Sequence, residues 1–446
     1  MLRFFLTLVF ALGLPALAQS AGKVTTFRLT NGMQAVVIED HRAPVVTHMV
    51  WYRIGAADEA PGKSGVAHLL EHLMFKGTQK FGPGEFSRIV EANGGTENAF
   101  TSFDYTGYWQ RVASDRLSLM MEMEADRMRN LILSEQDVET ERAVVLEERN
   151  SRIENNPGAL LGEQRMAALY LNHPYGIPII GWRHEIEALT REDALDWYHT
   201  YYAPNNAILV VAGDVDPAEV ERLAWLYYSP IRPTIGIKPR QRPSEPPQLA
   251  ARRLKYADVR VAQPFVIRTY LAPERNAGDQ KTAAALTILA ELLGGSGITS
   301  VLGERLQIEQ KIALYANAYY DGLSLDPSGF GVVVVPAEGV SLDEAEAALD
   351  AELAAFVEAG PDPEHLARVM AQIRAAQIFA ADNLQGLGRR YGEALTSGLE
   401  VEDVEAWPDI LQSVTAEEVV AAARLVLDPK KSVTSWLMRP ETEASK

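Results

Sequence analysis

The feature that most constrains the fold is a proline-rich stretch at 229–248 with the same order of elements on either side of it. Its prolines are interspersed with Arg and Lys and show no helical periodicity, which predicts an exposed linker between two domains. The half before the linker has strand-like runs at 34–38 and 45–52. It continues through helices and closes with a helix that leads into a strand at 207–212.

The half after the linker repeats this order of elements. It starts with a strand-like run at 261–271, continues through helices, and again closes with a helix followed by a strand. Thr190 and Thr415 precede the two closing helices as N-caps, and Asp193 and Glu418 stand three positions later to complete capping boxes. The matched halves predict that the chain is built from a duplicated unit.

The predicted fold class is α+β, with two homologous α/β-sandwich domains. At 446 residues and 47% hydrophobic content, the chain is long enough to bury two cores. We predict an N-terminal domain at 22–228, the linker at 229–248 and a homologous C-terminal domain at 249–440.

The first residues have the pattern of a secretory signal peptide at 1–18. A basic residue precedes an apolar run at 4–14, and small residues follow at Ala16 and Ala18, so we expect cleavage before Gln19. The apolar run is shorter than the roughly 20 residues of a membrane span, and no later stretch is long and uncharged enough to replace it. The sequence therefore predicts an exported chain, periplasmic or secreted, with no membrane anchor.

Composition narrows the partners and the chemistry. The formal net charge of -18 disfavours nucleic acid and anionic lipid as partners. The chain contains no Cys, which excludes a disulfide framework and a lipid-modified Cys anchor. Any metal site must therefore be built from His and carboxylate ligands.

The sequence HLLEH, from His68 to His72, has the spacing of a zinc site. Ser64 as an N-cap, apolar residues at helical intervals and Gly77 as a stop signal predict a helix here. Two His four positions apart project from one face of a helix, within reach of one tetrahedral Zn²⁺. Glu71 lies beside the second His, close enough to act as the base that activates water without being a ligand. The pattern is the HxxEH signature of inverted zinc peptidases.

A catalytic zinc needs a third protein ligand. A helix that begins after Ser134, with Asp137 as its capping partner, carries Glu141 and Glu148 two turns apart on one face. We predict that Glu148 is the ligand and that Glu141 hydrogen-bonds a ligand or orients one of the His. Glu147 is the competing ligand, although it points about 100 degrees round the helix from Glu148 and away from Glu141.

The sequence resembles the family of pitrilysin, insulin-degrading enzyme and mitochondrial processing peptidase over nearly the whole mature chain. The resemblance is carried by GKSGVAHLLEHLMFKGT at 62–78, NAFTSFDYTGY at 98–108 and ERAVVLEE at 141–148. The interval between His72 and Glu148 fits the family's HxxEH-to-Glu pattern, which selects Glu148 over Glu147. The resemblance implies a zinc peptidase with one Zn²⁺ per chain, whose two similar domains form half of a clam-like chamber.

The resemblance also implies where substrate binds. The segment from Thr96 to Trp109 has the alternating residues of a strand, and in the family this strand lies at a sheet edge beside the zinc. A free edge offers N–H and C=O groups to an extended peptide, so Asn98, Ala99 and Phe100 are expected to hold substrate by strand addition.

One departure from the family lies in the second half. Active members present an Arg and, several residues later, a Tyr, which polarise the scissile carbonyl and secure the substrate. Here Gln307 occupies the Arg position, Tyr315 is shifted in register, and Arg305 is a weak substitute. We therefore predict that the chain supplies the zinc half of a composite site. A homologous partner chain would donate the Arg and Tyr in a heterodimer, or a second copy would complete a homodimer.

The predicted reaction is hydrolysis of peptides or unfolded polypeptides, with Glu71 as the base and Glu141 supporting the site. The alternatives are a noncatalytic scaffold subunit of the same family and a module that captures extended peptides without cutting them. All four residues of the HxxEH-to-Glu pattern are present, which favours the peptidase.

Overall fold

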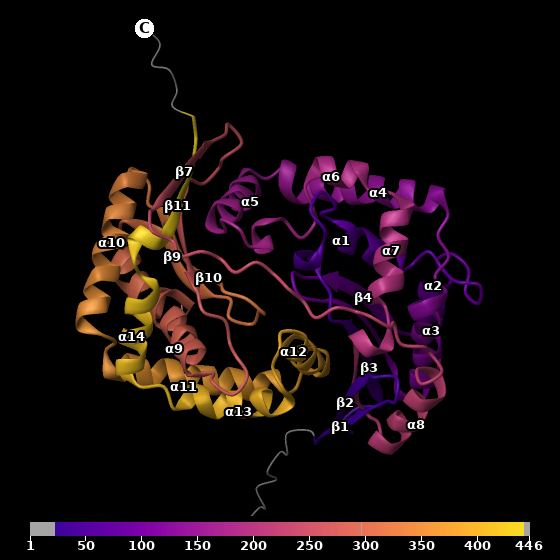
Figure 1. The fold of residues 1–446 in the computed structure, drawn as a ribbon. Helices are drawn as coiled ribbons and strands as arrows, with labels where there is room; N and C mark the ends of the chain where they lie inside the picture. Colours follow the sequence, from indigo (N-terminus) through magenta and orange to yellow (C-terminus); the bar gives the residue numbers. More distant parts are fainter. Residues whose placement is uncertain (1–22, 296, 441–446) are drawn as a thin grey trace, which may run out of the picture.

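The computed structural model describes residues 23–295 and 297–440, which form two α/β halves side by side (Figure 1). The predicted signal peptide at 1–18 lies outside these residues. Within the described residues, no helix is both long enough and apolar enough to cross a membrane.

The first sheet has six strands in the order β1-β2-β6-β3-β5-β4. They are β1 Val24–Arg28, β2 Gln34–Glu39, β3 Val45–Tyr52, β4 Thr96–Thr101, β5 Thr106–Ala113 and β6 Ala207–Gly213. Strands β2 and β6 run parallel, and all other neighbours in this sheet are antiparallel. Strand β4 lies at one edge, where it pairs with β5 alone.

The second sheet has five strands in the order β7-β11-β8-β10-β9. They are β7 Arg252–Ala257, β8 Phe265–Ala272, β9 Ala313–Tyr320, β10 Ser328–Pro336 and β11 Ser432–Met438. Strands β7 and β11 run parallel and the other neighbours antiparallel, so β7-β11-β8-β10-β9 repeats the connectivity of β2-β6-β3-β5-β4. The predicted α+β fold built from a duplicated unit is confirmed.

The start of the second half differs from the prediction. The strand expected from Val261 begins at Phe265, because Val261 lies in a turn in which its N–H donates to the carbonyl of Asp258. A strand that the sequence did not indicate, β7, comes before this turn. Its side chains alternate between half-buried and exposed, so its hydrophobic signal is weak.

Helices cover the sheets. Those of the first half are α1 Val66–Leu73, α2 Glu85–Ala92, α3 Leu117–Asn130, α4 Glu135–Arg149, α5 Pro157–Leu169, α6 Arg183–Ala188, α7 Arg191–Tyr201 and α8 Pro217–Tyr227. Those of the second half are α9 Lys281–Ala290, α10 Leu342–Ala359, α11 Pro363–Ala380, α12 Leu384–Thr396, α13 Val401–Gln412 and α14 Ala416–Val426. The capping boxes predicted at Thr190 and Thr415 are confirmed at the starts of α7 and α14.

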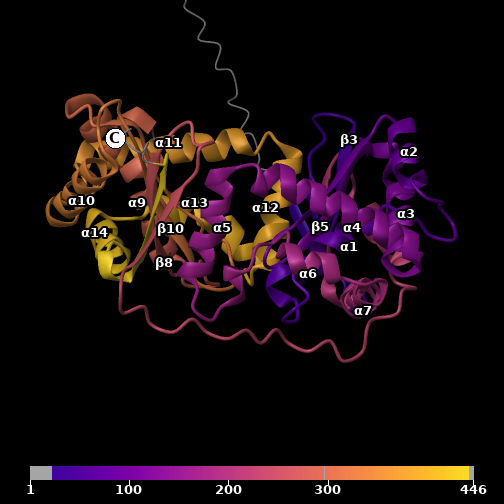
Figure 2. The ribbon, with the colours of Figure 1, turned by 90° about the horizontal axis from the view of Figure 1, so that it is seen from above.

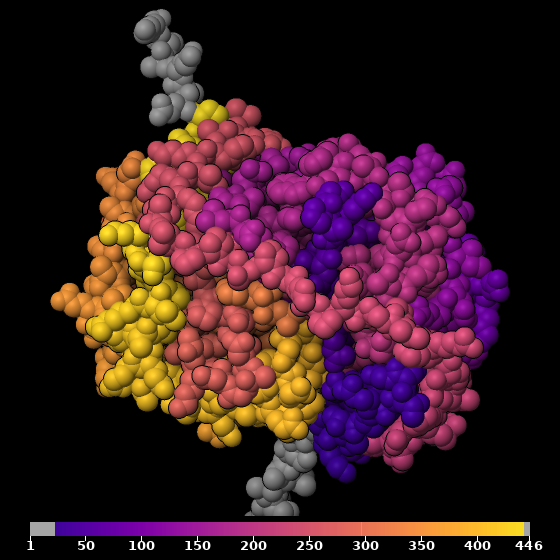
Figure 3. Space-filling view, in the orientation of Figure 1, coloured from indigo at the N-terminus to yellow at the C-terminus, as the bar shows by residue number. Residues whose placement is uncertain are grey.

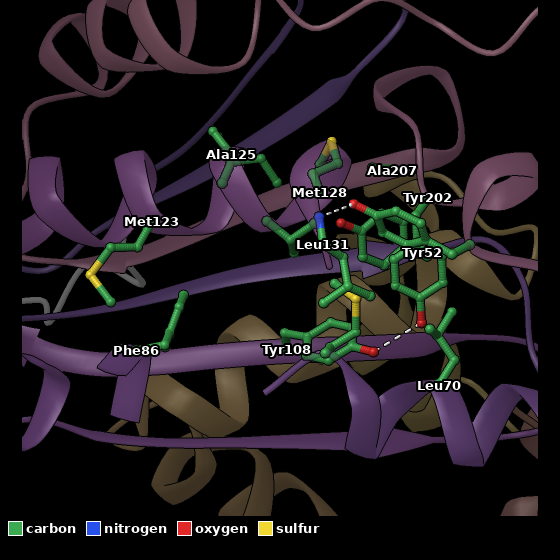
Figure 4. Close-up of a cluster of buried hydrophobic side chains, with 14 of the residues drawn as sticks. Tyr52, Leu70, Phe86, Tyr108, Met123, Ala125, Met128, Leu131, Tyr202 and Ala207 are labelled. Carbon is green, nitrogen blue, oxygen red and sulfur yellow. Dashed lines mark hydrogen bonds between the residues drawn. The ribbon is translucent and has the colours of Figure 1, made fainter. Parts of the chain in front are cut away.

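The core of the first half fixes the position of α1. Leu70 of α1 is fully buried against the sheet together with Tyr52, Tyr108 and Tyr202, as Figure 4 shows. The hydroxyls of Tyr108 and Tyr202 lie 2.9 Å apart and hydrogen-bond each other, which satisfies two polar groups in an apolar core. The apolar face of α1 is therefore held on the sheet, and its polar face is left for α4.

Each half also contributes one helix to the sheet of the other half. Helix α12 buries Tyr391 and Ala394 against the face of the first sheet opposite α1, where Trp51 lies. Helix α5 buries Leu161 and Leu169 against the second sheet (Figure 1). Because the exchanged helices complete both cores, the two halves are packed as one body.

The predicted linker at 229–248 contains neither helix nor strand and crosses the surface between the halves (Figures 2 and 3). It is not exposed throughout, since the side chain of Arg242 is only 6% exposed. Its guanidinium lies 2.9 Å from Asp58, 2.6 Å from Asp104 and 2.9 Å from Asp326. Arg242 thus joins carboxylates of both halves. The domain boundaries themselves stay a prediction.

Candidate metal centre

Helix α1 carries the HLLEH sequence, but its ends differ from the prediction. It begins at Val66 after Gly65, whose φ of 91° is a backbone conformation that favours glycine. Ser64 is not the N-cap, because its hydroxyl accepts a hydrogen bond from the N–H of Trp182 instead. The helix ends at Leu73, before the predicted stop at Gly77.

A glutamate from the preceding turn takes the capping role that the sequence assigned to Ser64. The carboxylate of Glu59 accepts hydrogen bonds from the N–H groups of Gly65 (2.9 Å) and Ala67 (2.8 Å). Glu185 accepts one from the N–H of Ser64 at 2.8 Å. Glu59 stands too far from α1 in the sequence for the capping-box spacing to identify it.

Replacing Glu59 by Ala is expected to destabilise the fold by about 1–2 kcal/mol, since two N–H groups at the start of α1 lose their acceptor. Glu59→Gln keeps an acceptor oxygen and should retain most of the stability. Thermal unfolding of both variants beside the wild type measures the difference. Equal melting temperatures for wild type and Glu59→Ala would show that α1 does not depend on this cap.

The same residue gives a pH dependence with a definite sign. Burial outweighs the hydrogen bonds from Ala67 and Gly65 and raises the pKa of Glu59 from 4.5 to about 8. A carboxyl whose pKa is higher in the folded chain stabilises it most below the unfolded pKa, and this contribution is lost as the pH rises from 4.5 to 8. The wild type should therefore lose stability relative to Glu59→Gln across that window.

The structure brings His68 and His72 of α1 together with Glu148 of α4. One ligand atom from each residue lies within 4.8 Å of the others, a grouping that suits a metal ion. The Oε2 atom of Glu148 is 3.3 Å from Nε2 of His72 and 3.7 Å from Nε2 of His68. A tetrahedral zinc with bonds of about 2.0–2.2 Å separates its ligand atoms by roughly 3.3–3.6 Å. The spacing and the donor set therefore fit zinc, with one position left for water.

The charges in this group also suit a cation. Burial opposes the charged form of His72, but hydrogen bonds with Glu141 and Glu148 outweigh it and raise the pKa of His72 to about 9. Burial and the neighbouring His72 lower the pKa of His68 to about 4. A ligating imidazole must be neutral, so binding of a metal displaces the proton of His72.

Glu141, the predicted supporting residue, lies beside His72. Its Oε2 atom is 3.3 Å from Nδ1 of His72, and its Oε1 atom is 2.6 Å from Nζ of Lys76. The hydrogen bonds with His72 and Lys76 lower the pKa of Glu141. Glu141 therefore stays a carboxylate that fixes the ring of His72 with Nε2 toward Glu148.

Two basic residues complete the surroundings of the carboxylates, and the sequence prediction did not include them. Lys76 contacts Glu141, and Arg152 places its Nη1 atom 2.7 Å from Oε1 of Glu148. The hydrogen bond with His72 and the charges of His68 and Arg152 lower the pKa of Glu148. The i,i+4 spacing of Glu148 and Arg152 is the signal that could have identified Arg152.

Glu71 lies next to the ligand group but outside it. Its Oε2 atom accepts a hydrogen bond of 2.5 Å from the hydroxyl of Thr101 on β4. Burial raises the pKa of Glu71, and the hydrogen bond from Thr101 opposes this shift. A carboxyl with a raised pKa beside a metal position has the properties of a general base.

The predicted substrate strand is one arm of a hairpin. The sequence indicated a single strand from Thr96 to Trp109, whereas β4 ends at Thr101 and β5 starts at Thr106. The turn between them was hidden because the alternation of residue types runs on through it. Strand β4 lies at the sheet edge, as the prediction requires.

The three predicted contact residues lie on β4 with alternating directions. Asn98 is exposed, Ala99 packs against the core on the α1 side, and Phe100 packs on the opposite side. The ring of Phe100 lies 4.7 Å from that of Trp51 and under the guanidinium of Arg389 from α12. The second half thus contacts β4 through α12.

The second-half residues that depart from the family pattern lie around β9. Arg305 pairs with Glu309 at 2.6 Å. The side-chain amide of Gln307 is oriented so that its nitrogen donates to the carbonyl of Leu314 at 3.1 Å. Its oxygen then accepts a hydrogen bond from the N–H of Ala316 on β9 at 3.2 Å. Tyr315 is exposed on β9. Among the described residues (23–295 and 297–440), no hydrogen bond or ion pair joins Arg305, Gln307 or Tyr315 to the ligand group.

Comparison with known proteins gives two matching families. Residues 34–182 match the family described as insulinase (peptidase family M16). Residues 188–373 match the family described as the peptidase M16 inactive domain. The zinc protease PqqE of Helicobacter pylori is 35% identical to this chain over 318 residues, which cover 69% of each protein.

Solved structures share the whole fold. The crystal structure of a protease from Helicobacter pylori matches with a TM-score of 0.87 at 27% identity and covers 93% of this chain and 99% of that one. The periplasmic protease PqqL of Escherichia coli matches with a TM-score of 0.81 at 20% identity, which shows a shared fold. That match covers 94% of this chain but 48% of PqqL, so the fold described here corresponds to about half of the longer protein.

Proposed function

Because the chain belongs to the insulinase family of M16 peptidases, we propose that it is a zinc metalloendopeptidase that cuts peptides or unfolded polypeptides bound as an extended strand. The resemblance found in the sequence is thereby confirmed at the level of the family. One observation carries the proposed activity, namely the convergence of His68, His72 and Glu148 beside a half-buried Glu71 that is not part of the ligand group.

The proposed mechanism needs no covalent intermediate. Zinc held by His68, His72 and Glu148 would lower the pKa of the attacking water and polarise the scissile carbonyl. Glu71 takes the proton of the attacking water and delivers it to the leaving amine. Glu141 holds the ring of His72, and the free edge of β4 aligns the peptide backbone.

The experiment that tests this function is cleavage of a quenched peptide by the purified chain. We expect turnover with one equivalent of zinc per chain, loss of turnover after chelation, and recovery when zinc is restored. A chain that binds zinc and peptide yet forms no products would instead be a noncatalytic scaffold or peptide-binding subunit. That second candidate is favoured by the match of residues 188–373 to the inactive domain.

The second half supports the proposal of a partner chain. By the sequence resemblance, Gln307 takes the position at which active members of the family present an Arg, and PqqL is about twice as long as the region it shares with this chain. We propose that a homologous chain, or a second copy, supplies the missing Arg and Tyr. Assay of the chain alone and with its co-purified partner tests this, because full activity of the lone chain contradicts it.

We propose export to the periplasm or beyond. The pattern at 1–18 supports this location, and one protein of the same fold is called a periplasmic protease. N-terminal sequencing of the mature chain tests the cleavage expected before Gln19.

A further inference from the structure

The residue that joins the substrate strand to the base is Thr101, the last residue of β4. Its hydroxyl donates a hydrogen bond to Oε2 of Glu71 at 2.5 Å. Within the part of the chain that the structure describes, no second side chain forms a hydrogen bond with that carboxylate. The orientation of Glu71 therefore depends on a group that belongs to another element, far away in the sequence.

The side-chain alternation of β4 explains why Thr101 can reach the base. Successive residues of a strand point to opposite faces, so Thr101 shares a face with Ala99, while Phe100 points the other way. Ala99 packs in the core on the α1 side, and Phe100 packs against Trp51 on the α12 side. Thr101 is thus the residue at the end of β4 that faces α1.

Helix α1 alone leaves the carboxylate of Glu71 free to turn. A Glu side chain rotates about its terminal bond, and no residue of α1 hydrogen-bonds this one. Reacting groups must be held to within fractions of an ångström, and a misplacement of about 1 Å can cost on the order of 100-fold in rate. A hydrogen bond on Oε2 leaves Oε1 available for the attacking water.

We propose that Thr101 is a positioning residue, which holds the carboxylate of Glu71 in the orientation for proton transfer and ties it to the strand that receives the peptide. This inference rests on the proposed peptidase function. It assigns to β4 a second role besides backbone pairing: the same strand that aligns the peptide also aligns the base. Docking of substrate and orientation of Glu71 are thereby set by one element.

The test compares Thr101→Val, which loses the hydroxyl at constant shape, with Thr101→Ser, which keeps it. The matched control is Thr106→Val, because Thr106 is the direct cross-strand partner of Thr101 and its hydroxyl donates to the carbonyl of Ile54 instead. Zinc content, kcat and KM for a quenched peptide are measured for each variant and for the wild type.

We expect Thr101→Val to lower kcat by about 10- to 100-fold with little change in KM or zinc content. Thr101→Ser should recover most of the wild-type rate. In a Glu71→Gln background Thr101→Val should have no further effect, because the group that it positions is gone. A wild-type kcat for Thr101→Val, or an equal loss in Thr106→Val, would overturn the proposal.

A structural readout separates this proposal from the proposed function. Crystal structures of metal-free Thr101→Val and Thr101→Ser should show the Glu71 carboxylate turned or split between rotamers in the first and unchanged in the second. An unchanged Glu71 in both refutes the positioning role, whatever the activity. A zinc-loaded wild type without turnover refutes the peptidase, whereas the crystal structures still decide the role of Thr101.

Discussion

Replacing Glu71 by Gln is expected to lower kcat by about 100- to 10,000-fold while the chain keeps its zinc. Gln has nearly the same size and can still accept the hydrogen bond from Thr101, so the packing around the site should not change. It cannot take a proton from water, however. Because Glu71 lies outside the group formed by His68, His72 and Glu148, the metal should stay.

The measurement pairs turnover of a quenched peptide with the zinc content of the same protein. Glu147→Gln serves as the matched control, because Glu147 is an exposed glutamate one residue from a predicted ligand. The control should keep both zinc and activity. Substantial turnover by Glu71→Gln would refute the role of Glu71 as the base, whereas loss of zinc would show that Glu71 holds the metal.

Replacing Glu148 by Ala is expected to remove the metal itself and all zinc-dependent cleavage with it. Only two imidazoles would remain, and zinc in a catalytic site takes three protein ligands. The loss of Glu148 also removes the carboxylate oxygen that lies 3.3 Å from Nε2 of His72. His68→Ala and His72→Ala are expected to have the same result for the same reason.

Zinc content after dialysis and the thermal shift on adding zinc both report this loss. A metal that binds the folded chain alone raises the melting temperature, so the wild type should be stabilised by zinc and Glu148→Ala should not. Glu147→Ala is the control on the same helix and should respond as the wild type does. If Glu148→Ala retains one equivalent of zinc, the third ligand is a residue other than Glu148.

Much of the candidate site follows from local spacing. His68, Glu71 and His72 are placed on one side of α1 by helical periodicity, and Glu141 and Glu148 are placed on one face of α4 in the same way. Local rules work here because the relative directions of residues within one helix are fixed by 3.6 residues per turn. The capping boxes and the duplicated order of elements follow from equally local patterns.

Apart from Arg152, which stands four positions after Glu148, other parts of the site had no such signal. The cap on α1 comes from Glu59 rather than from the adjacent Ser64, and the hydrogen bond to Glu71 comes from Thr101. Lys76 forms an ion pair with Glu141 of α4. Each of these contacts requires the path of the chain in space, which residue spacing does not contain.

By itself, the sequence determined which side chains can act on a metal and which of them share a helix face. The tertiary structure decided that the faces of α1 and α4 meet at ligand distance, and that β4 ends where its last hydroxyl reaches Glu71. The physical reason is that periodicity fixes directions within an element. The distance between two elements, in contrast, depends on how their apolar faces pack on a common sheet, here through residues such as Leu70 and Tyr108.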